Sequence, residues 1–439
     1  MRSEKLLELP GISKTKFSYK FFQDFLFFLV VVALPSSFFA LLPTSLFVDL
    51  RFLFLLVSIL YLVIYFKYIA ELMDIPGGKA LLFLAFFLIF EVFVNSLFIQ
   101  NIPIYETMAI FRSNFSSPLA TLGFVLYIIS MDNYRIYRFM YWLVWASFIQ
   151  GFLYIFSNIS GINIFANNAT GYTFNGELIL QNMFAIPHYN GIVFAFAFIA
   201  TVTIKGFNKH WLWFSPLIVT IISIVRSQMI VYALVIIGTV ILINMSKIKV
   251  DFFKFVKLFM LILVFLGLIL TIFPSHLDRI SNKFRFDRKE EVSQSTYLEE
   301  GTFAFRLNLI EEAYTRTEEN NNLFLGNGYI REAEKGEYDF VVGGDTLIAP
   351  VIFTEGFAGI VLRLLPIGLL LAYYFKLFFF GNPKYKLFAI VSIALILPEI
   401  INGVQTKYFT YYTREVFILF VLAIVVFKDQ KMLRRVQES

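Results

Sequence analysis

The stretch that decides the fold is ALLFLAFFLIFEVFVNSLFI, residues 80–99, in which Glu91 is the single charged residue. A helix needs about 20 predominantly apolar residues to cross the roughly 30 Å hydrocarbon core of a bilayer. This stretch meets that length, and we expect it to form a transmembrane helix.

Apolar runs of similar length recur along nearly the whole chain of 439 residues. The composition agrees, because 59% of the residues are hydrophobic and 15% are charged, against about 25% charged in a typical soluble domain. The sequence therefore predicts an all-α fold, a polytopic transmembrane helical bundle of about 12 spans. These spans are expected at residues 21–42, 50–66, 80–99, 115–131, 139–157, 186–204, 211–225, 227–245, 255–273, 347–374, 387–403 and 412–427. The spans at 115–131 and 211–225 are short and also fit re-entrant segments.

Basic residues indicate the orientation of the bundle. Lys and Arg gather between alternate spans, as in residues 1–20, 247–257 and 428–435, whereas residues 158–190 contain none. The positive-inside rule places the basic segments in the cytoplasm, and an even number of spans returns the C-terminus to the same side. The apolar run 21–42 is too long for the core of a cleaved signal peptide. We therefore expect a multi-pass membrane protein with both termini in the cytoplasm.

The residue types also bound the chemistry. The chain has no Cys, which excludes disulfides and thiolate metal sites, and its three His share no metal-ligand spacing. The formal net charge of +6 comes from short basic clusters between apolar runs, and no P-loop or Rossmann fingerprint is present. We expect no cofactor, no metal site and no nucleic-acid partner, and a metal held by carboxylates is the one alternative left open.

One long polar segment, from Pro274 to about Asp345, interrupts the apolar pattern, and the topology places it outside the cytoplasm. It contains nine Lys and Arg against fifteen Asp and Glu, and it is too long for a simple connector. The chain thus divides into N-terminal spans at 1–273, an external (periplasmic) loop at 274–346, and C-terminal spans with a cytoplasmic tail at 347–439.

Within this loop, a repeat of large apolar residues predicts an amphipathic helix. The residues of the expected apolar face are Phe303, Leu307, Ile310 and Tyr314. The stretch NNNLFLGNGY, residues 320–329, then breaks the helix with Asn and Gly. The helix could simply cap the bundle, but we favour a functional lid, because large external loops are where a bundle can build a site.

The other outer segment, 158–190, is uncharged apart from Glu177 and rich in Asn, Gly and aromatic residues. Its sequence indicates short β-like or re-entrant structure. Such side chains suit sugar hydroxyls and rings, and they suit an ordinary loop or a membrane-interface belt at least as well.

Charged residues in or beside the spans point to a site, because an ion in hydrocarbon is costly unless it faces a partner or a wet cavity. Arg226 lies between two apolar runs at the predicted outer face. Several arginines at the outer leaflet would form a phosphate or pyrophosphate site, and we favour that role for Arg226 and Arg306. For Arg363, Lys407 and Arg414, snorkelling or local pairing is an equal alternative.

Glu91 is a buried carboxylate with Asn95 one turn further along the expected helix. It fits a structural partner for an arginine, which we favour, or part of a proton path.

Three stretches carry a resemblance to a known family. They are FAIPHYNGIVFAF (184–196), SIVRSQMIVYALVI (223–236), and the series FRLNLIEEAY (305–314), LFLGNGY (323–329) and GGDTLIAPVIFTEGFAGIV (343–361). They resemble, in order, a helix start, a Ser-Arg element that opens the next helix, and the signature external loop of the bacterial O-antigen polymerase and ligase family. The matching residues are Pro187, Asn190, Gly191, Arg226, Arg306, Gly326, Gly328, Asp345, Glu355, Gly356 and Gly359.

The resemblance implies a glycosyltransferase at the outer face of the bacterial plasma (inner) membrane. Its donor would be a glycan on undecaprenyl pyrophosphate and its acceptor another lipid-linked repeat unit, so that repeats are polymerised into the O-antigen of lipopolysaccharide or into capsular or exopolysaccharide. Membrane lipids, a chain-length regulator and a flippase are the further partners implied. Where the ligases carry His followed by Asn, this chain has Asp345-Thr346, which favours a Wzy-type polymerase over a ligase.

In that scheme the expected catalytic residues are Asp345, Arg226 and Arg306. Asp345 would be the general base for the acceptor hydroxyl, although its position before an apolar run also fits a helix N-cap. The two arginines would stabilise the charge of the departing pyrophosphate. The expected substrate-binding residues are Arg363, Arg414, Lys407, His188, Asn190 and Glu355.

Two other classes of protein remain as alternatives. A lipid-linked oligosaccharide flippase or other transporter would also need cationic residues in a cavity, but it usually shows two similar halves, and we find no internal repeat. A structural or assembly protein would not explain outer-face arginines beside apolar spans.

Overall fold

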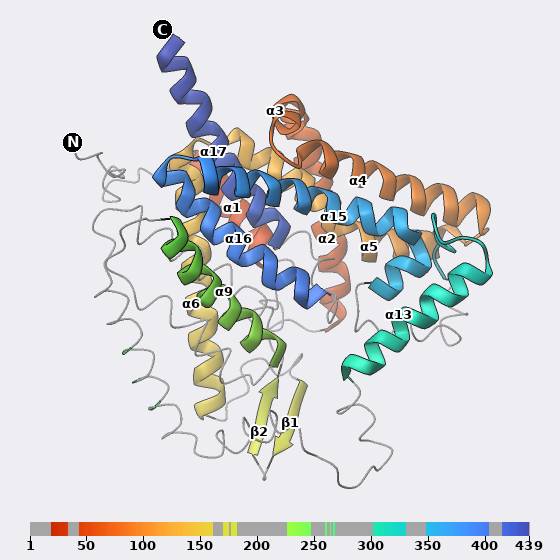
Figure 1. Ribbon diagram of the computed structural model, residues 1–439. Helices are drawn as coiled ribbons and strands as arrows, with labels where there is room; N and C mark the ends of the chain where they lie inside the picture. The colour runs from red at the N-terminus through yellow and green to blue at the C-terminus, as the bar shows by residue number, and fades with distance from the viewer. Residues whose placement is uncertain are drawn as a thin grey trace. The chain divides into compact units, whose positions relative to one another are not determined.

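The computed structural model describes residues 19–33, 44–160, 170–174, 177–181, 226–246, 302–330, 348–403 and 415–438, with Met260, Val264 and Gly267 as isolated positions. Figure 1 shows that the regular elements of these residues are helices apart from one short hairpin. The chain forms two compact units. The first comprises residues 1–50, 132–288 and 374–395, and the second comprises residues 51–131, 289–373 and 396–439.

The helices of the described residues are α1 (Tyr19–Ala33), α2 (Thr44–Tyr65), η3 (Phe66–Tyr68), α3 (Ile69–Asp74), α4 (Gly78–Phe90), η4 (Glu91–Ile99), α5 (Ile104–Ser130), α6 (Asn133–Ser160), α9 (Arg226–Ser246), α13 (Thr302–Glu319), α15 (Ile348–Phe380), α16 (Pro383–Gly403) and α17 (Glu415–Glu438). The described parts of the expected spans are helical over nearly their whole length, but the bounds differ, and α5 begins eleven residues before the span expected at 115–131. The expected spans at 186–204 and 211–225 lie outside the described residues. Of the span expected at 255–273, the structure describes three positions.

Three helical segments in the described ranges are long and apolar enough to cross a membrane. They are Leu55–Asp74, Gly78–Phe98 and Ile348–Phe380. Together with the composition, they establish a helical membrane protein.

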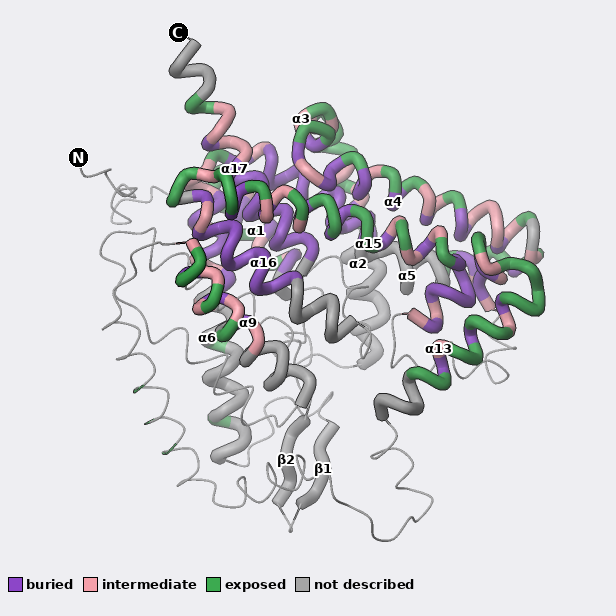
Figure 2. Tube along the Cα trace, in the orientation of Figure 1, coloured by how far each residue is buried: buried purple, intermediate pink, exposed green. Residues whose placement is uncertain are grey.

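α4 shows the surface that a lipid-facing helix requires. Leu84 and Leu88 are fully buried, whereas Phe83, Phe86 and Phe90 are 59–60% exposed. Figure 2 shows how buried and exposed positions alternate along α4. A helix that is apolar all round suits the core of a large protein or a bilayer, and adjacent exposed rings would be unfavourable in water. The exposed phenylalanines therefore fit contact with lipid.

In the second unit, α5 packs against α2 and α17 through aromatic rings. The Tyr127 ring lies 5.1 Å from that of Tyr61 and 4.8 Å from that of Tyr65, measured between centroids. Phe124 meets Phe417 of α17 at 6.0 Å. Such edge-to-face pairs add to the stabilisation from burial alone.

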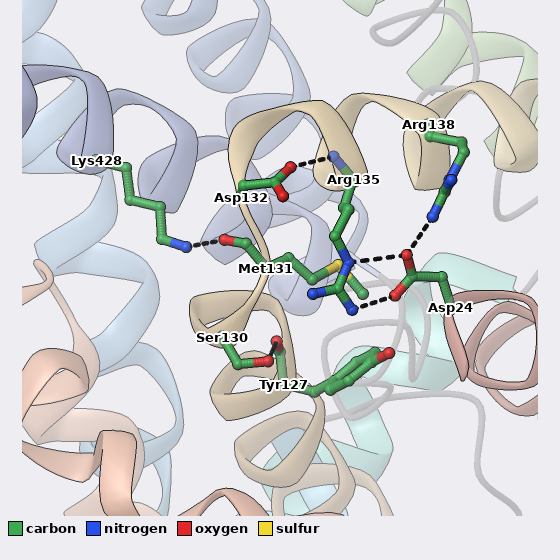
Figure 3. A network of polar contacts seen from close by, with 8 residues as sticks. All are labelled: Asp24, Tyr127, Ser130, Met131, Asp132, Arg135, Arg138 and Lys428. Carbon is green, nitrogen blue, oxygen red and sulfur yellow. Dashed lines mark hydrogen bonds and ion pairs between the residues drawn. The ribbon is translucent and has the colours of Figure 1, made fainter. Parts of the chain in front are cut away.

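A lysine of α17 satisfies the carboxyl end of α5. Lys428 Nζ donates to the carbonyl of Ile129 at 2.6 Å and to the carbonyl of Met131 (Figure 3). The last carbonyls of a helix lack intrahelical partners and carry partial negative charge. The ammonium group thus stabilises the end of α5 and fixes α17 beside it.

In the first unit, Asp24 joins α1 to α6. Its fully buried carboxylate accepts hydrogen bonds from Arg135 Nε at 2.9 Å and Nη2 at 2.6 Å, and from Arg138 Nη2 (Figure 3). Asp132 Oδ1 accepts from the Arg135 amide at 2.9 Å, as an N-cap does. Two arginines near a helix N-terminus oppose the helix dipole, and the two carboxylates offset that cost.

A two-stranded hairpin lies in the segment for which β-like or re-entrant structure was predicted. β1 (Thr170–Phe174) pairs antiparallel with β2 (Glu177–Gln181), with Thr170 opposite Gln181 and Phe174 opposite Glu177. Within the described residues, the hairpin is the one departure from an all-α fold.

Candidate functional site

The candidate site, which lies in the second unit, begins at a break in α15. Gly356 has φ 64° and ψ −163°, so the helix is interrupted there and backbone groups on both sides lose their helical partners. Within a membrane-spanning segment such groups must be satisfied by other protein atoms. Residues 323–328, which we call the clasp, supply them. The bonds are Asn327 N to Phe353 O (2.6 Å), Gly328 N to Thr354 O (3.0 Å), Phe357 N to Leu323 O (2.9 Å) and Ala358 N to Phe324 O (3.0 Å).

Two glycines allow the clasp to approach α15 this closely. Gly326 and Gly328 both have φ 78°, a conformation that other residues rarely adopt. A Cβ on Gly326 would lie 2.5 Å from the backbone of Thr354, and one on Gly328 would clash with the Gln100 side chain. The clasp therefore requires glycine at both positions.

A buried ion pair joins the two sides of the break, because Glu355 precedes Gly356 and Arg363 follows it in α15. Glu355 accepts from Arg363 Nε at 2.8 Å and from Nη2 at 2.5 Å, and the two residues are 2% and 6% exposed. The Tyr329 hydroxyl donates to Glu355 Oε1 at 3.1 Å. Gly359 lies so close that a Cβ there would clash with the Glu355 side chain. We expected Glu355 and Arg363 to bind substrate, and in the structure each is a partner of the other.

Tyr329 holds its proton unusually tightly. Burial raises the pKa of its hydroxyl well above the ordinary value, and the negative charge of Glu355 raises it further, while Arg363 acts in the opposite direction. Tyr329 is therefore a neutral hydrogen-bond donor that ties the end of the clasp to Glu355.

The segment η4 contributes a second buried carboxylate. Glu91 is 4% exposed, and Asn95 Nδ2 donates to its Oε1 at 2.5 Å. A Cβ on Gly328 would lie 2.9 Å from Asn95 Nδ2, so Glu91 and Asn95 lie beside the clasp. η4 is a π-helix, a rare form that is frequent at functional sites. Just beyond it, Gln100 Nε2 donates to the carbonyl of Asn327.

Asn327 connects the clasp to the end of α13. Its Oδ1 accepts from Asn320 Nδ2 at 3.2 Å and from Asn322 Nδ2 at 3.1 Å. Its Nδ2 lies 3.5 Å from Thr317 Oγ1, to which it donates. The Asn327 side chain thus connects the clasp to the end of α13, and the Asn327 backbone amide connects it to α15.

The predicted amphipathic helix is present as α13, and its predicted apolar face is buried in part. Leu309 and Ala313 are buried and pack on Ala349 and Phe353 of α15, and Ile310 of the predicted face packs against this cluster. Leu307 and Tyr314, also expected on the apolar face, are 45% and 36% exposed, although the Tyr314 ring lies 6.3 Å from that of Phe357, measured between centroids. The buried face is therefore shifted toward Leu309 and Ala313.

The remaining expected residues are only partly placed. Arg226 is the first residue of α9, in the first unit, and Arg306 lies in α13. The side chains of both are outside what the structure describes. Asp345, Lys407, Arg414, His188 and Asn190 lie outside the described residues altogether. Among expected residues whose side chains are described, Glu355 and Arg363 are the pair that the fold brings together.

Three residues of the site were not anticipated from the sequence. Asn327 and Tyr329 lie in the quoted stretch NNNLFLGNGY, where Gly-Asn-Gly indicates a tight turn but not its partner. Gln100 follows an apolar run, and no signal marked it. In the described part of the chain, no group of three or more His, Asp or Glu is arranged to hold a metal ion.

No family model matches the sequence, and no curated protein is significantly similar to it. The class of protein that the fold and the site define is a helical membrane protein with a polar clasp docked on a broken, apolar helix. Any narrower function must be argued from the residues of the chain itself.

Proposed function

We propose that the protein is a membrane glycosyltransferase that polymerises oligosaccharide repeat units carried on undecaprenyl pyrophosphate. It would act at the outer face of the bacterial inner membrane, within a bundle of about 12 spans with both termini in the cytoplasm. The observation that supports this most is the way the residues of the signature-like loop assemble. The stretches LFLGNGY and TEGFAGIV form one structural unit, in which Gly326, Gly328, Glu355, Gly356 and Gly359 each have a specific structural role.

The clasp gives the external loop a fixed geometry. α13 packs on α15 through Leu309 and Ala313. The clasp, which follows the C-terminal end of α13, forms backbone hydrogen bonds on both sides of the break at Gly356. A loop anchored in this way would give a catalytic group on α13, such as Arg306, the fixed position that catalysis requires.

The reaction would be a displacement at the anomeric carbon of the donor sugar. The acceptor hydroxyl oxygen forms the new bond to that carbon, and the bond from the carbon to the pyrophosphate oxygen breaks. Asp345 would accept the hydroxyl proton, and undecaprenyl pyrophosphate leaves with the electron pair. Arg226 and Arg306 would offset the growing negative charge of the pyrophosphate.

The test is glycan profiling of a deletion strain that expresses variants of the protein. With Arg226→Ala or Arg306→Ala we expect loss of long chains and retention of single repeats, with normal amounts of protein in the membrane. Asp345→Asn separates the two roles of that residue, because Asn caps a helix about as well as Asp but cannot act as a base. Glu311→Gln, on the exposed side of α13, is the control and should support normal chains. Normal long chains in both arginine variants would refute the proposal.

A transporter is the second candidate, and the break in α15 favours it. Interrupted helices that expose backbone groups form the binding sites of many transporters. The same deletion strain separates the two. Loss of a polymerase leaves single repeats on the cell surface. Loss of a flippase removes these surface repeats, and lipid-linked repeats accumulate instead. A ligase would also accumulate lipid-linked material, but as polymer.

A further inference from the structure

The buried charges around the clasp do not balance. Two carboxylates, Glu91 and Glu355, are 4% and 2% exposed, and both lie in segments apolar enough to span a membrane. The guanidinium of Arg363 binds both oxygens of Glu355. One positive charge can neutralise one carboxylate, whichever carboxylate it faces, so a second neutralising group is needed.

The elements packed against η4 supply no such group in the described residues. From its own helix, Glu91 receives the neutral amide of Asn95. α15 offers Glu355 and Arg363, which are already paired, and the loop offers Tyr329, whose hydroxyl is neutral. α4 carries one charged residue, Lys79, about three helical turns before Glu91. On α5 the charged and titratable groups are Tyr105 and Glu106, which bond to each other at 3.0 Å, Tyr127, whose ring packs on Tyr61 and Tyr65, and Arg112, whose side chain is not described.

A second polar group beside Glu91 lacks a partner. Ser96 is fully buried, and its hydroxyl has no hydrogen-bond partner among the described residues. The i to i+5 repeat of a π-helix places Ser96 one turn along η4 from Glu91. A lone buried hydroxyl is costly unless it is paired with a protein group or a water, and such a pairing would lie next to the carboxyl group.

We propose that Glu91 is a proton-binding site within the membrane, and that its carboxyl group is held protonated while the clasp is closed. A neutral carboxyl removes the charge imbalance, because burying an unpaired ion costs far more than binding a proton. The bond already present fits this state: Asn95 donates to Oε1, which leaves Oε2 to carry the proton. The site takes one proton from water and releases one when it ionises.

Ionisation of Glu91 has a defined consequence for the clasp. It would place a second negative charge near Glu355. Arg363 and Tyr329 would then interact with both carboxylates, and their bonds to Glu355 would weaken. The closed clasp should therefore lose stability relative to the open one as Glu91 ionises. This inference does not depend on the proposed glycosyltransferase activity.

The experiment is infrared difference spectroscopy of the full-length protein in lipid nanodiscs at neutral pH, comparing wild type with Glu91→Gln. We expect the wild type to show the carbonyl stretch of one protonated carboxylic acid that is missing from E91Q. The control is Glu311→Gln on the exposed surface of α13, which should leave that band unchanged. Identical bands in wild type and E91Q would overturn the proposal.

Thermal unfolding supplies a second, independent readout. Gln mimics a protonated Glu and cannot ionise, so E91Q should fold and should unfold within a degree or two of wild type below the ordinary glutamate pKa of about 4.3. It should become the more stable of the two as the pH is raised above that value, because the unfolded wild type then releases the proton that the folded protein retains. An E91Q protein that fails to fold, or that melts far below wild type at every pH, would contradict the proposal. That result would mean that Glu91 is ionised and paired with a cation.

Discussion

At the scale of single residues, the pair formed by Glu355 and Arg363 is the most sensitive feature of the site. Both side chains are almost completely buried, at 2% and 7% exposure, and Arg363 spans both carboxylate oxygens. A buried ion pair adds little net stability compared with apolar residues, but removing one partner leaves an uncompensated charge. The site therefore depends on both members being present.

Glu355→Gln should lower the free energy of unfolding by about 3–5 kcal/mol, because it leaves Arg363 buried without a counter-ion. Thermal unfolding of the purified protein in nanodiscs measures this. The matched control is Glu312→Gln, which breaks an ion pair on α13 whose side chains are 41% and 44% exposed and should cost at most about 0.5 kcal/mol. Equal melting temperatures for the two variants would show that the Glu355 pair is not buried as described.

Tyr329→Phe tests the hydroxyl that joins the clasp to Glu355. At neutral pH the loss of its hydrogen bond should cost about 1 kcal/mol. The pKa of Tyr329 is raised in the folded protein, so its contribution to stability is complete below the ordinary tyrosine pKa of about 10 and is lost as the pH rises above it. The stability advantage of wild type over the variant should therefore shrink above about pH 10. An advantage that grows there would contradict the assignment.

The sequence identified Arg363 as an unusual charge in an apolar setting and Glu355 through the family resemblance, but not the two residues as partners. The two residues are eight positions apart, which in a straight helix separates their Cα atoms by about 12 Å. The break at Gly356 changes that geometry, and nothing in the local sequence predicts its φ of 64°. Glu91 and Asn95 were recognised together because they are neighbours within one helix.

At the scale of elements, the clasp explains how a broken helix persists in an apolar segment. Two carbonyls before the break and two amides after it form hydrogen bonds with backbone groups of residues 323–328. The same contacts join α13 to α15 within the second unit. A change in the clasp should therefore release α13 before it affects the spans.

Gly326→Ala should destabilise this arrangement by about 1–3 kcal/mol, since Ala at φ 78° is strained and its Cβ meets the backbone of Thr354. Gly368→Ala is the control, because a Cβ there has nothing within 4 Å and Ala favours a helix over Gly by up to about 1 kcal/mol. Limited proteolysis of residues 302–330 and the melting temperature are the two measurements. Faster cleavage in the Gly368 variant than in the Gly326 variant would argue against the clasp.

The existence of α13 was predictable, but its orientation was not. A repeat of Phe303, Leu307, Ile310 and Tyr314 correctly indicated a helix, because helical spacing is a local property of the sequence. The face that α13 buries depends on its contacts with α15, which no local pattern specifies. Ile310 packs there as expected, whereas Leu307 and Tyr314 are partly exposed although their spacing suggested a buried face.

At the scale of the whole molecule, composition alone was sufficient for the class. A chain with 59% hydrophobic and 15% charged residues has too little polar surface for a soluble fold of this size, and three described helices are suited to a bilayer. The hairpin β1–β2 was less predictable, because its segment carries turn and loop residues that also fit a re-entrant structure. The number of spans and their orientation stay predictions.

The chain contains no Cys, so single cysteines introduced by mutation can be labelled against a clean background. Glu311 lies exposed on α13, in the loop that we place outside the membrane, and Gln437 lies near the end of α17, in the tail that we place in the cytoplasm. Neither residue takes part in the clasp or the ion pair, so their replacement should leave the fold intact.

The most direct test is to treat intact spheroplasts with a maleimide that cannot cross membranes. The account predicts that Glu311→Cys is labelled at once, and that Gln437→Cys is labelled only after the membrane is permeabilised. The reverse pattern would place the clasp and its helix in the cytoplasm, away from any lipid-linked glycan at the outer face, and would contradict the proposed function.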